Sequence, residues 1–168
     1  MPHESHPRSE ANAQAAIDPT MWDEEAAGES SFPAIENSTT LYRLVMARRL
    51  HPRDHVLRGT FLRRKPKEDG TPRDTKGLST ALPNGKQHSE MIDAQFARRE
   101  KPCAVCYLSV SDVTSIAIPG TSLTIDVRQS SSDHANIKRL PPHGQSGQFP
   151  ALAEKLATEL AKRAQVQE

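Results

Sequence analysis

Hydrophobic and polar positions follow their clearest pattern in the middle of the chain, where two segments predict strands. Residues 103–110 (CAVCYLSV) form a short, almost entirely apolar run rich in β-formers, which is typical of a strand covered on both faces. Residues 123–127 alternate between apolar and polar side chains, and this period of two predicts a strand with one buried face. We expect these two segments to form the centre of a small sheet.

Shorter segments add to the predicted sheet. Residues 41–46 (LYRLVM) predict an opening strand, and residues 77–80 (GLST) predict a short edge strand. Residues 129–133 are polar and predict a loop. After this loop, residues 134–140 (HANIKRL) predict a further strand that two prolines end.

Two segments have helical patterns, and a shorter turn lies between them. Residues 89–100 (SEMIDAQFARRE) begin with a serine that suits an N-cap, with acids in the first turn and arginines near the end, as the helix dipole favours. Ser111 predicts the cap of a single helical turn that runs to Ile116. Residues 150–164 begin with proline and repeat leucine every four residues, so they predict an amphipathic helix packed on the sheet.

The distribution of charge separates a tail from a body. Residues 1–40 carry a net charge of −7 and the remaining residues +8, which together give the +1 of the whole chain. The tail is rich in Pro, Ser, Glu and Ala, and such a composition buries too little apolar surface to offset the entropy of ordering. We therefore predict a disordered acidic tail over residues 1–39. Residues 40–168 predict a single small α+β domain with a mixed sheet, one internal helix and the C-terminal amphipathic helix.

Signals of membrane and secreted proteins are missing from the sequence. The chain contains no run of about 18 apolar residues, so we expect no membrane span. Residues 1–10 (MPHESHPRSE) lack the apolar core of a secretory signal. The two cysteines lie three residues apart and do not make a disulfide framework. These observations predict a cytoplasmic protein.

Basic side chains concentrate between residues 41 and 76, where 11 Lys or Arg residues face 4 Asp or Glu residues. Such a segment is typical either of a solvated basic face or of a nucleic-acid or anion-binding surface. The candidate binding residues are Arg48, Arg49, Arg58, Arg63, Arg64, Lys65 and Lys67. Few aromatic residues are interleaved with them, which provides poorly for stacking on single strands.

A candidate catalytic group centres on His134, whose side-chain type is best suited to proton transfer near neutral pH. Asn136 shares its face of the predicted strand, and Ser79 and Arg43 complete the candidate site of a small enzyme that acts on a nucleotide or nucleic acid. The sequence contains neither of the glycine-rich phosphate-binding motifs, so no nucleotide-binding fold is identified. The enzyme hypothesis predicts that these side chains converge on one pocket. Placement of Ser79 and His134 on opposite faces would refute it.

The segments HSE at 88–90 and PCAVC at 102–106 resemble the H-x-E…P-C-x-x-C signature of zinc-dependent nucleobase deaminases. This resemblance implies a zinc ion held by His88, Cys103 and Cys106. The spacing argues against it, because 11 residues between the two motifs cannot finish a helix and supply a further strand. Thiols three positions apart on a strand also point to opposite faces. We therefore expect no cofactor and two buried structural thiols.

Several motifs together resemble a group of small, uncharacterised bacterial proteins. The motifs are LYR at 41–43, HP at 51–52, Phe61, DTKGLST at 74–80, the run from Val105 to Ile116, HANI at 134–137 and LP at 140–141. This resemblance implies a bacterial cytoplasmic protein with one compact domain, and it implies no activity. The opening LYR also resembles ADP-ribosyltransferase-like toxins, in which such an arginine contacts NAD. On that resemblance Arg43 would contact NAD.

The sequence leaves three functional hypotheses open. The acidic tail on a basic body, without a recognisable catalytic constellation, favours an interaction or accessory protein that acts with a larger protein partner. The alternatives are a small enzyme of the ADP-ribosyltransferase or zinc-deaminase type, and a nucleic-acid-binding protein that uses residues 48–67. Whether the protein is an enzyme stays undecided at this level.

Overall fold

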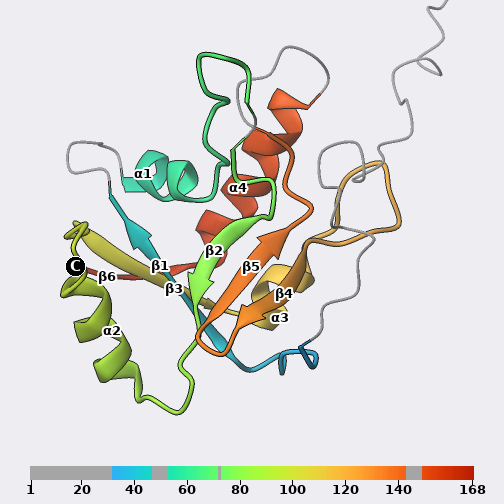
Figure 1. Ribbon diagram of the computed structural model, residues 1–168. Coiled ribbons are helices and arrows are strands. Elements are labelled where there is room, and N and C mark those ends of the chain that lie inside the picture. The colour runs from blue at the N-terminus through green and yellow to red at the C-terminus, as the bar shows by residue number, and fades with distance from the viewer. Residues whose placement is uncertain (1–31, 47–52, 72, 143–148) are drawn as a thin grey trace, which may run out of the picture.

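The computed structural model describes residues 32–46, 53–71, 73–142 and 149–168 (Figure 1). Most of the predicted acidic tail lies outside these ranges, and so do Arg48 and Arg49 of the basic segment. The strands are β1 (Thr40–Val45), β2 (Leu78–Ala81), β3 (Ala104–Ser109), β4 (Asp126–Ser131), β5 (His134–Lys138) and β6 (Gln165–Gln167). The helices are α1 (Arg53–Thr60), α2 (His88–Phe96), α3 (Val110–Thr114) and α4 (Pro150–Arg163).

The strands form one sheet in the order β4-β5-β2-β1-β3-β6, and the predicted α+β class is confirmed. Every pair is antiparallel, where the sequence had suggested a mixed sheet. β2 is an interior strand between β5 and β1 rather than an edge strand. β4 begins only at Asp126 and lies at the edge, with β5, β2 and β1 between it and β3. The expectation that residues 103–110 and 123–127 form the centre of the sheet is therefore wrong for 123–127, whereas β3 is an interior strand.

Two apolar cores on opposite faces of the sheet explain the continuous apolar run of β3. Val105 is fully buried in the core beneath α2, together with Met91 and Ile92 of that helix. Cys106 is fully buried in the larger core, which includes the leucines of α4. A strand with both faces covered has no room for alternating polar side chains. The predicted β3 is thus confirmed for the predicted reason.

Helices cover both faces of this sheet. The larger core receives Leu152, Leu156 and Leu160 from α4, whose first residue is Pro150, so the predicted C-terminal amphipathic helix is confirmed. α1 and α3 join α4 on that face, and α2 packs on the other (Figure 1). The helix expected at residues 89–100 is α2, which begins at His88 and ends at Phe96.

Some local predictions need correction. The single helical turn is α3, and its cap is Ser109, whose hydroxyl accepts from the Asp112 backbone N–H at 3.1 Å. The polar segment 129–133 is largely strand, because β4 continues to Ser131 and forms a tight turn into β5. α1 was missed within the basic segment, because it presents few apolar positions to set a helical period.

β1 and β2 separate from each other soon after they meet. β1 pairs with β3 along six positions, but its register with β2 is limited to Tyr42 opposite Ala81. β2 instead follows β5 over four positions. Gly77, at φ 102°, allows the chain to enter β2 against the backbone of Ile137, where a Cβ would collide with the Ile137 carbonyl oxygen. The sheet therefore opens between β1 and β2 beyond Tyr42.

Candidate functional site

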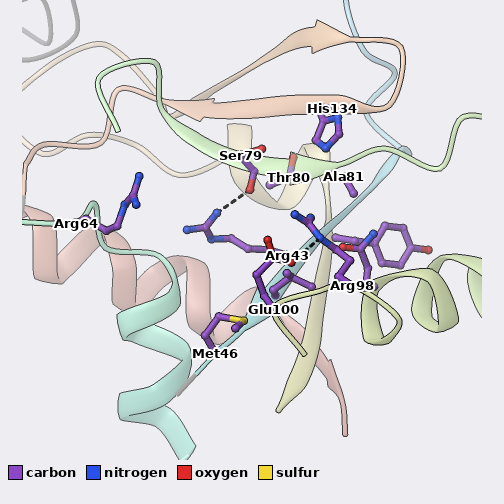
Figure 2. Close-up of a pocket in the computed structure, with 12 residues that line it drawn as sticks. Arg43, Met46, Arg64, Ser79, Thr80, Ala81, Arg98, Glu100 and His134 are labelled. Atoms are coloured by element: carbon purple, nitrogen blue, oxygen red, sulfur yellow. Dashed lines mark hydrogen bonds and ion pairs between the residues drawn. The ribbon is translucent and has the colours of Figure 1, made fainter. Parts of the chain in front are cut away.

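A cavity of about 350 Å³ lies at this opening of the sheet (Figure 2). Its walls come from β1, β2, the C-terminal end of α2 and the first residue of β5. Arg43, Ser79 and His134, three of the four candidate catalytic residues, all line it. The fourth, Asn136, is the β5 partner of Ser79 but is not part of the cavity wall.

Ser79 and His134 share a face of the sheet because of the strand register. Ser79 pairs with Asn136, and Ala81 pairs with His134. Directly paired residues, and residues two apart on one strand, project from the same face. The arrangement that would have refuted the enzyme hypothesis is therefore absent. The His134 ring lies near the β4–β5 turn, with Nδ1 3.4 Å from Ser131 Oγ and 3.8 Å from an Asp133 carboxylate oxygen.

Arg43 bridges the two strands where they separate. Its Nε donates to the Thr60 carbonyl at the end of α1, and its Nη1 donates to the Ser79 carbonyl, both at 2.7 Å. Figure 2 shows the guanidinium reaching from β1 toward Ser79. Burial lowers the pKa of Arg43 from its ordinary value, and in the described ranges no carboxylate forms an ion pair with it. A guanidinium has five N–H donors, so donors remain for an anionic ligand.

Arg64 stands at the rim of the cavity and is oriented by Asp74. Arg64 Nη2 lies 2.9 Å from Asp74 Oδ1, and the Arg64 backbone N–H donates to Asp74 Oδ2 at 2.7 Å. Burial alone would raise the pKa of Asp74, but the hydrogen bonds from Arg64 outweigh it and hold that pKa below its ordinary value. The Arg64 side chain stays 68% exposed, so it remains accessible to a ligand.

The turn that follows α2 contributes cavity residues that the sequence did not indicate. Arg98 and Glu100 line the cavity and form an ion pair, with Arg98 Nε 3.3 Å from Glu100 Oε2. Their sequence positions suggested only a helix end that complements the dipole. In the view of Figure 2, the guanidinium groups of Arg64 and Arg98 lie on either side of that of Arg43. The cavity wall therefore carries three arginines and, within the described residues, one carboxylate.

The remaining basic candidates are distributed over different environments. Arg63 is 3% exposed and donates to the carbonyls of Leu140 and Arg73 at 3.2 and 3.0 Å, so it fixes a loop instead of facing a ligand. Arg58 Nε lies 3.0 Å from the Glu154 carboxylate of α4. Lys65 and Lys67 are exposed. Binding of nucleic acid by this segment stays a prediction.

The residues of the deaminase-like motif do not come together. Cys106 belongs to the core under α4, whereas His88 lies on the α2 face, where its Nδ1 is 2.8 Å from the Tyr42 hydroxyl. Burial raises the pKa of Cys106 to about 12. The Cys103 thiol donates to the Val45 carbonyl at 3.0 Å. No group of three or more His, Cys, Asp or Glu side chains suited to a metal ion occurs in the described ranges.

No family model matches this sequence, and no curated protein or solved structure shows significant similarity to it. The resemblances to the bacterial group and to ADP-ribosyltransferase-like toxins therefore stay predictions, as does a larger protein partner. None of the described helices combines the length and the apolar character that crossing a bilayer requires.

Proposed function

We propose that the cavity binds a nucleotide through its phosphates, and that the protein is a group-transfer enzyme of the ADP-ribosyltransferase type with NAD as donor. The observation that carries this proposal is the convergence of Arg43, Ser79 and His134 where β1 and β2 separate. Arg43 is the arginine of the LYR motif, which on its resemblance to ADP-ribosyltransferase-like toxins would contact NAD.

The charge of the cavity suits an anion. Arg43, Arg64 and Arg98 present planar donor groups that match phosphate oxygens in bidentate geometry. Arg43 is held by two carbonyls before any ligand arrives, so little side-chain entropy is lost on binding. A cavity of about 350 Å³ lies within the range of small-molecule sites.

The same residues provide the chemistry that transfer from NAD needs. Cleavage of the bond between nicotinamide and ribose releases neutral nicotinamide and leaves positive charge on the ribose, which a carboxylate stabilises. Glu100 is the carboxylate in the described cavity wall. His134 lines the same cavity, and its side-chain type suits the role of proton acceptor for the attacking group. In this proposal Arg43 holds the phosphates, Glu100 stabilises the developing charge and His134 receives the proton.

Calorimetric titration with NAD, together with mass-spectrometric detection of released nicotinamide, tests the proposal. Arg98→Ala removes one phosphate donor. We expect binding to weaken by roughly ten- to 150-fold, because a charge-assisted hydrogen bond contributes about 1.5–3 kcal/mol. Arg99→Ala is the matched control, because Arg99 is an exposed neighbour that does not line the cavity. Failure of the native chain both to bind NAD and to release nicotinamide would remove the proposal.

A further inference from the structure

A second cavity of about 300 Å³ adjoins the first. Four residues line both cavities: Ala81, Gln95, Arg98 and His134. His134 therefore stands at the junction, accessible from either side, and its side chain is 44% exposed. A group bound in one cavity and a group bound in the other would meet beside the His134 imidazole.

The wall of the second cavity is built by the turn that follows β2. The Leu82 backbone N–H donates to the Asp133 carbonyl at 2.8 Å, which ties this turn to the turn before β5. Asn84 adopts a left-handed backbone at φ 45°, and the Lys86 N–H closes the turn on the Pro83 carbonyl at 3.0 Å. The cavity is thus formed by a fixed turn.

The second cavity differs chemically from the first. Leu82 and Met91, which are 6% and 3% exposed, give it an apolar wall. Asn84, Lys86 and Asp133 add an amide, an amine and a carboxylate. Arginines predominate among the charged residues of the first cavity, whereas the second cavity combines Lys86, Arg98 and Asp133 with its apolar wall. This combination suits a flat, neutral group whose edge carries both donors and acceptors, which describes a nucleobase.

We propose that the second cavity binds a nucleobase that accepts the group transferred from the first cavity. This inference rests on the proposed function. A ring or exocyclic nitrogen of the base attacks the ribose carbon of NAD, the bond from that carbon to nicotinamide breaks, and nicotinamide leaves with the electron pair. The proton lost by the attacking nitrogen passes to the imidazole of His134. The products are the ADP-ribosylated base, nicotinamide and one proton, so atoms and charge balance.

Two measurements test the inference and separate it from the proposed function. The first is calorimetric titration of the native chain with nucleosides and with short single-stranded DNA and RNA, without NAD. The second is mass spectrometry of the same compounds after incubation with NAD and the native chain. Binding and a mass increase on nucleosides identify a free base as acceptor, whereas binding and an increase confined to oligonucleotides identify a base within a strand. Either result supports the inference.

Variants locate the acceptor in the second cavity. Asn84→Gly removes the amide but keeps the left-handed backbone, and Lys86→Ala removes the amine. For each we expect about tenfold weaker binding of the acceptor, which corresponds to about 1.4 kcal/mol and one lost hydrogen bond. Lys76→Ala, an exposed lysine outside both cavities, should bind as the native chain does.

The results that overturn the inference differ from those that overturn the proposed function. If NAD is cleaved but no base or oligonucleotide binds or gains mass, the inference fails and the proposed function stands. If NAD is neither bound nor cleaved while bases bind and Asn84→Gly weakens them, the proposed function fails and the base site stands. Binding that neither Asn84→Gly nor Lys86→Ala changes would place the base elsewhere and refute the inference.

Discussion

Replacement of Arg43 by methionine tests whether its partly buried guanidinium holds the opening between β1 and β2. Methionine keeps an unbranched apolar chain but removes every donor and the charge. The carbonyls of Thr60 and Ser79 then lose the donors that lie 2.7 Å away in the native protein. Because the strands pair at so few positions, no ladder hydrogen bond is available to replace this bridge.

The expected magnitude follows from these two hydrogen bonds. A hydrogen bond from a charged donor contributes about 1.5–3 kcal/mol, so the pair contributes about 3–6 kcal/mol before any correction. Removal of the partly dehydrated cation also relieves a desolvation cost, which we set at about half of that sum. We therefore expect the free energy of unfolding to fall by about 1.5–3 kcal/mol. For a domain of this size the melting temperature falls by roughly 6–12 °C.

Urea unfolding followed by circular dichroism measures the change in stability, and NAD titration measures the change in binding. Arg64→Met is the matched control, since this arginine is 68% exposed and an exposed ion pair contributes about 0–1 kcal/mol. We expect Arg43→Met to lose both stability and NAD binding, and Arg64→Met to lose mainly binding. An unchanged urea midpoint for Arg43→Met would show that the guanidinium does not bridge the strands.

Three further predictions concern acid stability, thiol reactivity and the backbone. The pKa of Asp74 is lowered in the folded state, so its contribution is fully present above the ordinary value of 3.8 and is lost as the pH falls through the lower folded-state pKa. Asp74→Asn should lower the free energy of unfolding by about 1 kcal/mol at neutral pH. In Asp74→Asn the free energy of unfolding should also fall less steeply as the pH is lowered. If urea unfolding gave the same dependence of this free energy on pH for both proteins, the prediction would be wrong. Because burial raises the pKa of Cys106 to about 12, its thiol stays protonated at neutral pH. Maleimide should therefore modify only Cys103 in the folded protein, and labelled Cys106 in a peptide digest before unfolding would disprove this. Gly77→Ala should lower the free energy of unfolding by about 2–4 kcal/mol, because the new Cβ would collide with the β5 backbone at a residue of positive φ. Gly85→Ala should lower the free energy of unfolding by about 1 kcal/mol, because Gly85 has a positive φ but open space around it. Equal urea midpoints for the two variants would contradict the close contact between Gly77 and the Ile137 backbone.

The sequence predicts a strand or helix correctly where its hydrophobic pattern matches the side chains that the element buries. β3 and α4 bury their apolar residues in the cores that their patterns imply. The alternation at residues 123–127 is confirmed in part, since Ile125 and Val127 are buried but Leu123 is 36% exposed. Residues 123–125 precede β4, and Thr124 forms an isolated bridge with Ala117. The partner of β4 is β5 and not β3, because the choice of strand partner depends on contacts distant in sequence. Periodicity indicates which face is buried but does not name the neighbour.

The candidate site was predictable only in part, for a similar reason. Arg43, Ser79 and His134 could be named because their side-chain types suit anion binding and proton transfer. Arg98 and Glu100 could not, because nothing in the sequence reveals that the end of α2 lies beside β1. The opening between β1 and β2 is likewise a matter of register, which a strand pattern does not encode.

The enzyme and interaction-protein hypotheses place different demands on the surface. Stable protein interfaces depend on clustered aromatic and apolar anchors. In the described ranges the exposed large hydrophobic residues are Phe32, Met46 and Leu123, which come from separate segments. Arg43, in contrast, is a partly buried guanidinium that two carbonyls hold at the wall of a cavity, with donors left for an anion. A protein partner needs only a rim of solvated charges, which does not require a guanidinium fixed in this way. The placement of Arg43, more than the net charge of the body, therefore favours an anionic small-molecule ligand over a protein partner at this site.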